Sequence, residues 1–259
     1  MSGKEAEKVK KLLQKKGIQS YVFKINLSKL KNFHLEARQL RYDKITEFCN
    51  KKKIKHVLLG HHLDDQIENF YIRLSRGSGL TGLSPIKKIS KYKKHIFLRP
   101  FLSLGKSQLI KISKKYFNFY LKDTSNFNNK YLRSRVRKLR SFMEKEGFGD
   151  VRLLKTLDNF DKASEALNFY SETAKKKFIK KQTNFISISK KLFHEPYEIV
   201  FRCISSFFTE KKDYPPRAKG IARLIADLSQ LNKKKVTLGG YIFENGLNLV
   251  KVKREFRRC

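Results

Sequence analysis

The stretch HVLLGHHLDDQIENF, residues 56–70, gathers two histidines, two aspartates and a glutamate directly after a short apolar run. The apolar run at residues 56–59 predicts a short strand. Residues 65–75 predict a helix whose apolar side carries Ile67, Phe70, Tyr71 and Leu74. The acidic residues therefore lie at a junction between a strand and a helix.

The segments on both sides of this junction continue the alternation. Helices are predicted at residues 5–16, 35–51 and 109–116, and strands at 21–27, 95–101 and 119–121. Such alternation indicates an α/β fold, with a parallel sheet covered by helices. Ligands of open sheets of this kind bind beyond the carboxyl ends of the strands. The acidic residues follow one of those ends directly.

Beyond residue 144 the pattern changes to one of packing helices. A long helical stretch carries Leu153, Leu154, Leu157, Phe160, Ala163, Leu167, Tyr170 and Phe178. Further helices are predicted at residues 197–208 and 218–231. Strands at 236–243 and 247–252 flank Asn245-Gly246, which favours a hairpin. We therefore predict two domains, residues 1–144 and a mostly helical one at 145–259 that ends in a hairpin.

The composition points to a polyanionic partner. Sixty Lys plus Arg against 23 Asp plus Glu give a formal charge of +37, which favours nucleic acid. An anionic membrane is the competing explanation, but the chain has no run of about 18 apolar residues and no signal-peptide pattern. We therefore predict a cytoplasmic protein without a membrane segment.

The cysteines indicate neither disulfides nor a zinc site. Cys49, Cys203 and Cys259 are odd in number, far apart and without a CxxC pair. We expect reduced thiols.

Three interpretations of the acidic residues stay open. Asp64 and Asp65 fall in the first turn of the predicted helix, where the helix dipole favours carboxylates by about 0.3 to 1 kcal/mol. Glu68 lies on the same helix face as both, so the three carboxylates can instead form a functional site that binds a cation. A transition-metal site would add His61 and His62, although HHxDD is not a recognised zinc spacing.

Residues 77–82 fit the pattern GxGxxG without its structural context. The dinucleotide-binding pattern requires a strand before it and a helix after it. Here the run follows a helix and precedes Pro85, so we reject NAD binding. A closely packed or mobile loop remains, with Arg73 and Arg76 just before it.

A basic helix is predicted at residues 131–140. Arg133, Arg137 and Arg140 lie along one stripe of it, whereas Arg135 faces elsewhere. A solvated basic helix is one interpretation. A clamp for phosphate or carboxylate is the one we favour, because the planar guanidinium suits both anions.

Taken together, these stretches resemble the tRNA(Ile)-lysidine synthetases, a family of the PP-loop, or N-type ATP pyrophosphatase, superfamily, which has a Rossmann-like parallel sheet. The matching residues are Asn32, Ala37, Arg38, Arg41 and Tyr42; His61, His62, Asp64, Asp65, Gln66 and Glu68; Arg76 to Leu83; Arg99 to Leu102; and Asp123, Ser125, Asn126, Asn128, Tyr131, Arg133 and Arg137. Asn69 and Ser134 replace the usual Thr and Asn. Thr237 to Gly240 and Arg254-Glu255 give a weaker match to shorter family members.

The resemblance implies a reaction on the wobble cytidine of the minor isoleucine tRNA, which carries a CAU anticodon. ATP, expected with Mg²⁺, adenylates the C2 oxygen, and the amine of free lysine then displaces AMP. Whether the protein forms a homodimer stays open.

The resemblance also implies roles for the site residues. Asp65 and Glu68 would hold the ammonium of lysine, and Asp64 would face Mg²⁺ and ATP. Arg133 would hold the lysine carboxylate or an ATP phosphate. His62 would assist proton removal from the ammonium.

The remaining implied contacts come from arginines. Arg38 and Arg76 would contact ATP. The tRNA would contact Arg73, Arg76, Arg137 and Arg140.

The superfamily's ATP-phosphate loop, SGGxDS, is absent from the sequence. Ser2-Gly3-Lys4 matches only part of it, and the family layout places that loop before the first helix found here. We therefore expect a sequence truncated at its N-terminus, with weak or no ATP binding. The alternative is a non-catalytic tRNA-binding fragment or pseudoenzyme. A tRNA thiolase would require CxxC pairs or a catalytic cysteine, which the three cysteines do not provide.

Overall fold

The computed structural model describes residues 3–25, 33–121, 132–209, 216–230 and 233–255. The chain divides into two compact units, Met1–Phe160 and Asp161–Cys259. Their boundary lies inside one long helix, whereas the domain boundary predicted from the sequence lies at residues 144 and 145. The functional division into a catalytic and a substrate domain stays a prediction.

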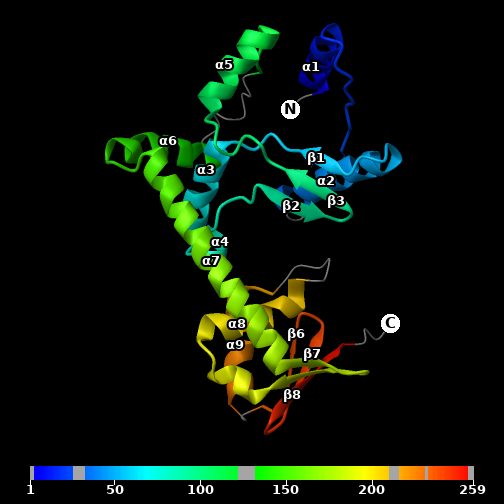
Figure 1. Cartoon of the computed structure of the whole chain (residues 1–259), viewed down its shortest axis with the longest axis vertical. Helices are drawn as coiled ribbons and strands as arrows, with labels where there is room; N and C mark the ends of the chain where they lie inside the picture. Colours follow the sequence, from blue (N-terminus) through cyan, green and yellow to red (C-terminus); the bar gives the residue numbers. More distant parts are fainter. Residues whose placement is uncertain (1–2, 26–32, 122–131, 210–215, 231–232, 256–259) are drawn as a thin grey trace. The chain divides into compact units, whose positions relative to one another are not determined.

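The first unit contains a small mixed sheet, whose strands are β1 (His56–Leu58), β2 (Ile89–Tyr92) and β3 (His95–Leu98) (Figure 1). Its order is β1-β3-β2. β1 and β3 pair in parallel, whereas β2 and β3 form an antiparallel hairpin. The predicted strands are confirmed over residues 56–58 and 95–98, whereas residues 99–101 form no strand, and β2 was not predicted.

Two other predicted strands are wrong where the structure describes them. Residues 21–25 and 119–121 form no strand, and residues 26–27 lie outside the described part. A strand needs a hydrogen-bonded neighbour, which alternation alone does not provide. Tyr21 and Phe23 instead pack their rings against Phe48, at 4.5 and 5.3 Å between centroids.

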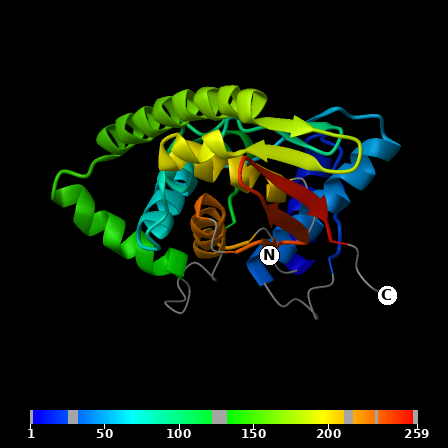
Figure 2. The same cartoon turned by 90° about the horizontal axis from the view of Figure 1, so that it is seen from below.

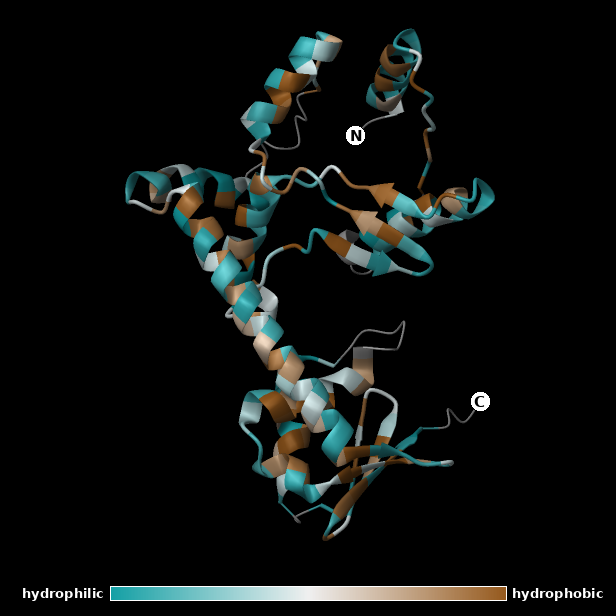
Figure 3. Cartoon of the chain, viewed as in Figure 1, coloured by the Kyte–Doolittle hydropathy of each residue, from teal (hydrophilic) through white to brown (hydrophobic). Residues whose placement is uncertain are grey.

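Helices form most of the first unit: α1 (Gly3–Lys15), α2 (Phe33–Lys51), α3 (Leu63–Leu74), α4 (Leu80–Leu83), α5 (Lys106–Phe117), α6 (Leu132–Lys145) and the start of α7 (Asp150–Phe178). All predicted helices in this region are confirmed. Figure 3 shows hydrophilic and hydrophobic residues interspersed along α7, as an amphipathic helix requires. The core joins α3, α6 and α7 through Leu63, Ile67, Phe70, Tyr71, Val136, Leu153 and Leu157.

The second unit packs helices on an antiparallel sheet. Its strands are β4 (Ile179–Lys181), β5 (Ile186–Ser189), β6 (Lys235–Leu238), β7 (Tyr241–Asn245) and β8 (Leu249–Arg254), in the order β4-β5-β8-β7-β6. The helices are α8 (Tyr197–Thr209), α9 (Ala218–Ser229) and the 3₁₀ helix η2 (Lys190–His194). Figure 2 shows α7 as one unbroken helix that leads into β4.

The predicted terminal hairpin is part of this larger sheet. The segment predicted as one strand at 236–243 divides into β6 and β7 at Gly239-Gly240, because both glycines have positive φ, +58° and +73°. Asn245 ends β7, and its side-chain amide donates to the carbonyls of Asp227 and Gln230 at 3.1 and 2.9 Å. Asn245 therefore also caps the carboxyl end of α9.

Two of the cysteines lie in the described part of the chain. Cys49 and Cys203 are buried free thiols, and burial raises the pKa of each. Among the described residues, no helix is long and apolar enough to cross a membrane.

Candidate functional site

The site begins where the parallel strands end. The N–H of Leu59 donates to the carbonyl of Leu98 at 2.8 Å, so the chain leaves β1 beside the carboxyl end of β3. His62 has an extended backbone and is the N-cap of α3. Its backbone N–H donates to Asp65 Oδ2 at 3.1 Å, which caps the helix start. The strand-to-helix junction predicted from residues 56–70 is confirmed.

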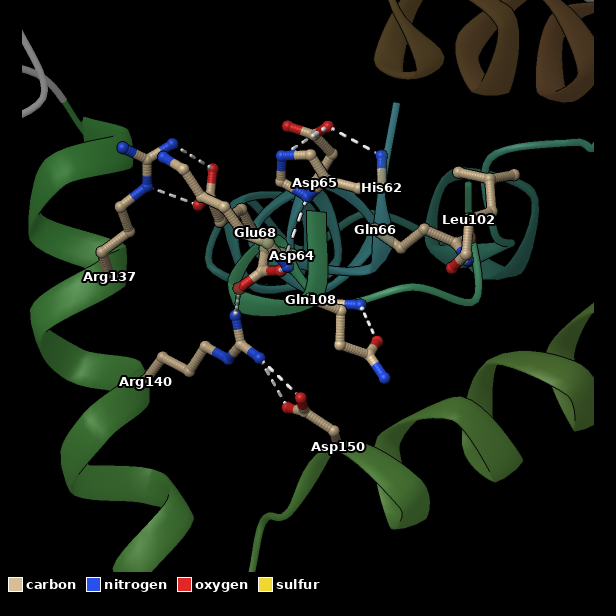
Figure 4. Close-up of polar contacts among 12 residues, drawn as sticks. His62, Asp64, Asp65, Gln66, Glu68, Leu102, Gln108, Arg137, Arg140 and Asp150 are labelled. Atoms are coloured by element: carbon tan, nitrogen blue, oxygen red, sulfur yellow. Dashed lines mark hydrogen bonds and ion pairs between the residues drawn. The ribbon is translucent and has the colours of Figure 1, made fainter. Parts of the chain in front are cut away.

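The His62 ring lies between two carboxylates (Figure 4). Its Nδ1 is 3.5 Å from Asp64 Oδ2, and its Nε2 is 3.5 Å from Asp65 Oδ2. Hydrogen bonding to Asp64 raises the pKa of His62 above its ordinary value of 6.5, although burial opposes this shift. The imidazole therefore changes its charge closer to neutral pH than a free histidine does.

Asp64 joins several helices. Its Oδ1 accepts from Arg140 Nη1 at 2.5 Å, and its Oδ2 accepts from the backbone N–H of Lys106, the first residue of α5, at 2.7 Å. Arg140 also donates through Nη2 to both carboxylate oxygens of Asp150, at 2.7 Å. Hydrogen bonds from His62, Lys106 and Arg140 hold the pKa of Asp64 well below its ordinary range.

Glu68 forms a buried ion pair. Its side chain is 2% exposed, and its two oxygens accept from Arg137 Nε at 2.5 Å and Nη2 at 3.2 Å. This hydrogen bonding raises the pKa of Arg137. Figure 4 shows Glu68 directed toward Arg137, whereas Asp65 is directed toward His62. The structure therefore pairs Asp64 and Glu68 with arginines of α6 and leaves Asp65 beside the histidine.

The other predicted arginines lie in different surroundings. Arg73 donates from Nη1 to the carbonyl of Gly82, which belongs to α4, and it thereby links α3 to α4. Arg38 places its guanidinium over the ring of Tyr42, 5.2 Å from the centroid. Arg76 and Arg133 are exposed. The matched residues at 123–131, and Asn32, lie outside the described part of the chain.

Asp64 does not fit the predicted role of a Mg²⁺ ligand in this arrangement. Both of its oxygens accept hydrogen bonds from cationic or backbone groups, and Arg140 already supplies its counter-charge. Within the described residues, no group of three or more His, Cys, Asp or Glu side chains could hold a metal ion. The spacing of the acids along the helix could not reveal this, because the pairing depends on how α6 packs against α3.

Asp150 is a site residue that was not predicted from the sequence. It is the first residue of α7 and holds Arg140 on the side opposite Asp64. Its only local signal is an acid at a helix start, which is common in proteins.

Comparison with known proteins identifies the family to which the chain belongs. The model of the PP-loop domain family matches residues 1–146. The chain belongs to the PP-loop family. It is 33% identical over 218 residues to a tRNA(Ile)-lysidine synthase of Wolbachia sp. subsp. Brugia malayi, covering 81% of this chain and 50% of that protein. It is 32% identical over 243 residues to a tRNA(Ile)-lysidine synthase of Orientia tsutsugamushi, and the match covers 88% of this chain and 54% of that protein. The resemblance found in the motifs is confirmed, and the chain spans about half the length of these relatives.

The His62 environment predicts a pH effect. A raised pKa means that protonated His62 stabilises the fold fully below pH 6.5 and that this stabilisation is lost as pH rises through the raised value. The pH dependence of stability that comes from Asp64 has the opposite sign. Because the fold lowers the pKa of Asp64, its ionised carboxylate stabilises the fold at higher pH, and this stabilisation is lost only as pH falls below 3.8. In Asp64→Asn we expect the NMR titration of the His62 ring to shift to lower pH. An unchanged titration would show that Asp64 does not hold the proton on His62.

Proposed function

We propose that this chain acts as a tRNA(Ile)-lysidine synthetase, which ligates lysine to C2 of the wobble cytidine of minor tRNA(Ile) at the expense of ATP. The C2 oxygen attacks the α-phosphate of ATP and pyrophosphate leaves. The lysine side-chain amine then attacks C2, loses a proton, and AMP leaves with the oxygen. Membership of the PP-loop family, the similar lysidine synthases and the charge of +37 support this proposal.

The observation that carries the proposal is the position of Asp65. Its carboxylate lies in the first turn of α3, beyond the carboxyl ends of β1 and β3, and its Oδ2 is fixed by the backbone N–H of His62. Its Oδ1 has no hydrogen-bond partner among the residues that the structure describes. A half-buried, oriented carboxylate with one oxygen available is suited to bind the ammonium of lysine.

The other residues then take supporting roles. Glu68 keeps Arg137 in place, and it contacts the ammonium only if Arg137 moves away. The exposed Arg133, one turn before Arg137 on α6, is available for the lysine carboxylate or a phosphate. His62 is the group nearest to Asp65 that can accept a proton from the ammonium, and its raised pKa makes it the stronger base.

ATP and tRNA are the proposed co-substrate and partner. We propose that the exposed Arg38 and Arg76 contact the phosphates of ATP. Arg76 is also free to contact RNA. Arg137 and Arg140 are engaged with Glu68, Asp64 and Asp150, so a charge reversal there would break ion pairs as well as remove an RNA contact. No step is assigned to a metal ion.

The test is lysine incorporation into a cytidine-bearing tRNA(Ile) transcript, followed with labelled lysine and with lysine-dependent release of AMP. We expect Asp65→Asn to raise the lysine requirement about ten- to hundredfold, because a charge-assisted hydrogen bond contributes about 1.5 to 3 kcal/mol. The affinity for tRNA should not change.

Glu144→Gln is the matched control, since it removes an exposed acid of α6. It should alter neither lysine use nor tRNA binding. Equal lysine dependence of the wild type and Asp65→Asn would remove the proposed role of Asp65. Tight tRNA binding without any lysine-dependent AMP release would favour the alternative, a non-catalytic tRNA-binding protein.

A further inference from the structure

Arg140 of α6 lies between two carboxylates that belong to different helices (Figure 4). Its Nη1 donates to Asp64 Oδ1 of α3 at 2.5 Å, and its Nη2 donates to both carboxylate oxygens of Asp150 of α7 at 2.7 Å. Because the Arg140 side chain is only 16% exposed, water and salt screen these contacts less than they screen a surface ion pair. The contact with Asp150 therefore influences how much of the guanidinium charge reaches Asp64.

The two groups of ion pairs in the site differ in their net charge. Glu68 and Arg137 form a neutral pair of one carboxylate and one guanidinium. Asp64, Arg140 and Asp150 combine two carboxylates with one guanidinium. This second group therefore keeps one negative charge that no guanidinium within it neutralises.

The atoms that meet show where this excess charge lies. Asp150 accepts from Arg140 with both of its oxygens, whereas Asp64 accepts from Arg140 only with Oδ1. Asp64 Oδ2 instead accepts from the backbone N–H of Lys106 at 2.7 Å and lies 3.5 Å from His62 Nδ1. The free side of the Asp64 carboxylate thus faces a neutral amide and the imidazole ring.

The pKa directions of these groups agree with this division. Burial alone would lower the pKa of Arg140, but hydrogen bonds to Asp150 and then to Asp64 raise it. The hydrogen bond with His62 is the largest cause of the lowered pKa of Asp64, ahead of the hydrogen bond with Arg140. Arg140 is thus held mainly by Asp150, and Asp64 interacts mainly with His62.

The charged groups that face His62 come from two helices. Hydrogen bonding to Asp64 is the largest effect on the pKa of His62 and raises it, whereas burial lowers it. The charge of Asp65, also on α3, raises the pKa, and the charge of Lys106 at the start of α5 lowers it. A change in the charge available on Asp64 therefore moves the proton on His62 more than a change in its other neighbours does.

We infer that Asp150 is a positioning residue for the proton on His62 and that it acts through Arg140. It holds the guanidinium toward α7, so that Asp64 keeps one oxygen and an uncompensated negative charge for the imidazole. Without the charge of Asp150, both Nη groups of Arg140 are free to form a bidentate pair with Asp64, which neutralises that charge. The consequence for catalysis rests on the proposed function, in which His62 accepts a proton, whereas the electrostatic link does not.

A purely structural role of Asp150 is the competing interpretation. An acid in the first turn of a helix stabilises that helix through its dipole, and Asp150 is the first residue of α7. Such a role predicts that loss of the charge weakens α7 without moving the proton on His62. The two interpretations are separable, because variants of Arg140 and of Asp150 break the same ion pair but have opposite electrostatic effects on His62.

The test is the NMR titration of the His62 ring in the full chain. Asp150→Asn should shift the titration to lower pH, because Arg140 then neutralises Asp64. Arg140→Gln should shift it to higher pH, because Asp64 then directs its whole charge to the imidazole. In the double variant, Asp150→Asn should cause no shift beyond that of Arg140→Gln, since the link through the guanidinium is absent.

Two further variants separate the charge of Asp150 from a general disturbance of α7. Asp161→Asn is the matched control, because it makes the same substitution at an exposed aspartate of the same helix, and it should leave the titration unchanged. Asp150→Glu keeps the charge and should return the titration toward that of the wild type. Hydrogen exchange of the α7 backbone amides reports any loss of helix stability separately.

The inference is overturned if Asp150→Asn leaves the His62 titration unchanged or if Asp161→Asn shifts it as much. An equal shift by Asp150→Asn with and without Arg140 would also overturn it, because Asp150 would then not act through the guanidinium.

The pH dependence of lysidine formation reports the consequence for catalysis. In Asp150→Asn its acid limb should move to lower pH together with the titration of His62. A shifted titration in a chain that forms no lysidine supports the role of Asp150 and rejects the proposed function. A shifted titration with an unchanged pH dependence also supports that role, and it shows that His62 is not the proton acceptor.

Discussion

Arg137→Ala will lower the free energy of local unfolding of α3 by about 3 kcal/mol. Glu68 is 2% exposed, and both of its oxygens accept hydrogen bonds from Arg137. Removal of the guanidinium leaves a carboxylate in the core between α3 and α6 without its counter-charge, and this usually costs about 3 to 5 kcal/mol. The lower figure applies because Arg137 is 32% exposed and water can reach part of the gap.

Hydrogen exchange of the α3 backbone amides measures this local free energy directly. Arg135→Ala is the matched control on the same helix, since Arg135 is exposed, and it should change the value by less than about 0.5 kcal/mol. The double variant Glu68→Leu, Arg137→Leu should recover much of the loss, because it removes both charges. Equal effects of Arg137→Ala and Arg135→Ala would show that the pair does not stabilise α3.

The helices were predictable because their signals are local. The spacing of Ile67, Phe70 and Tyr71 found α3, and all three side chains are buried. The strands depend on distant partners and were less predictable. Residues 21–25 alternate as well as any strand of the chain, yet no described strand pairs with them, whereas β2 forms because the turn at Lys93 folds it back on β3.

The candidate site was predictable only in its residue types. The sequence predicted carboxylates and histidines at the start of one helix and arginines along another. The structure has these residues at the start of α3 and along α6. The sequence could not show that Asp64 and Glu68 pair with those arginines, because such pairing depends on the packing of two helices far apart in the sequence. Helical spacing grouped Glu68 with Asp64 and Asp65, and the family resemblance paired Asp65 with Glu68, whereas the structure places Asp65 with His62.

The second large effect concerns the turn between β6 and β7. We expect Gly239→Ala to destabilise the second unit by about 2 to 4 kcal/mol, the sum of a backbone and a packing cost. The φ of Gly239 is +58°, a conformation that costs a residue with a Cβ about 1 kcal/mol or more. The added Cβ would also lie 2.7 Å from Phe208 Cδ1 and 3.0 Å from Pro216 Cγ. Since Phe208 is 2% exposed, its ring cannot move without disturbing the core, and such overpacking costs about 1 to 3 kcal/mol.

Gly220→Ala is the matched control, because it is the same substitution in the same unit with the opposite expected sign. Gly220 lies in α9 without a positive φ, and its added Cβ would meet Leu238 Cδ1 at an ordinary 3.6 Å. Alanine favours the helix there and should raise stability by about 0.4 to 1 kcal/mol. Urea unfolding measures the stability change of each variant, and hydrogen exchange of the backbone amides in β7 and β8 measures it locally in the second unit. If Gly239→Ala were as stable as the wild type, the turn would have to tolerate a side chain against Phe208, and the close packing of β6 and β7 on α8 would be wrong.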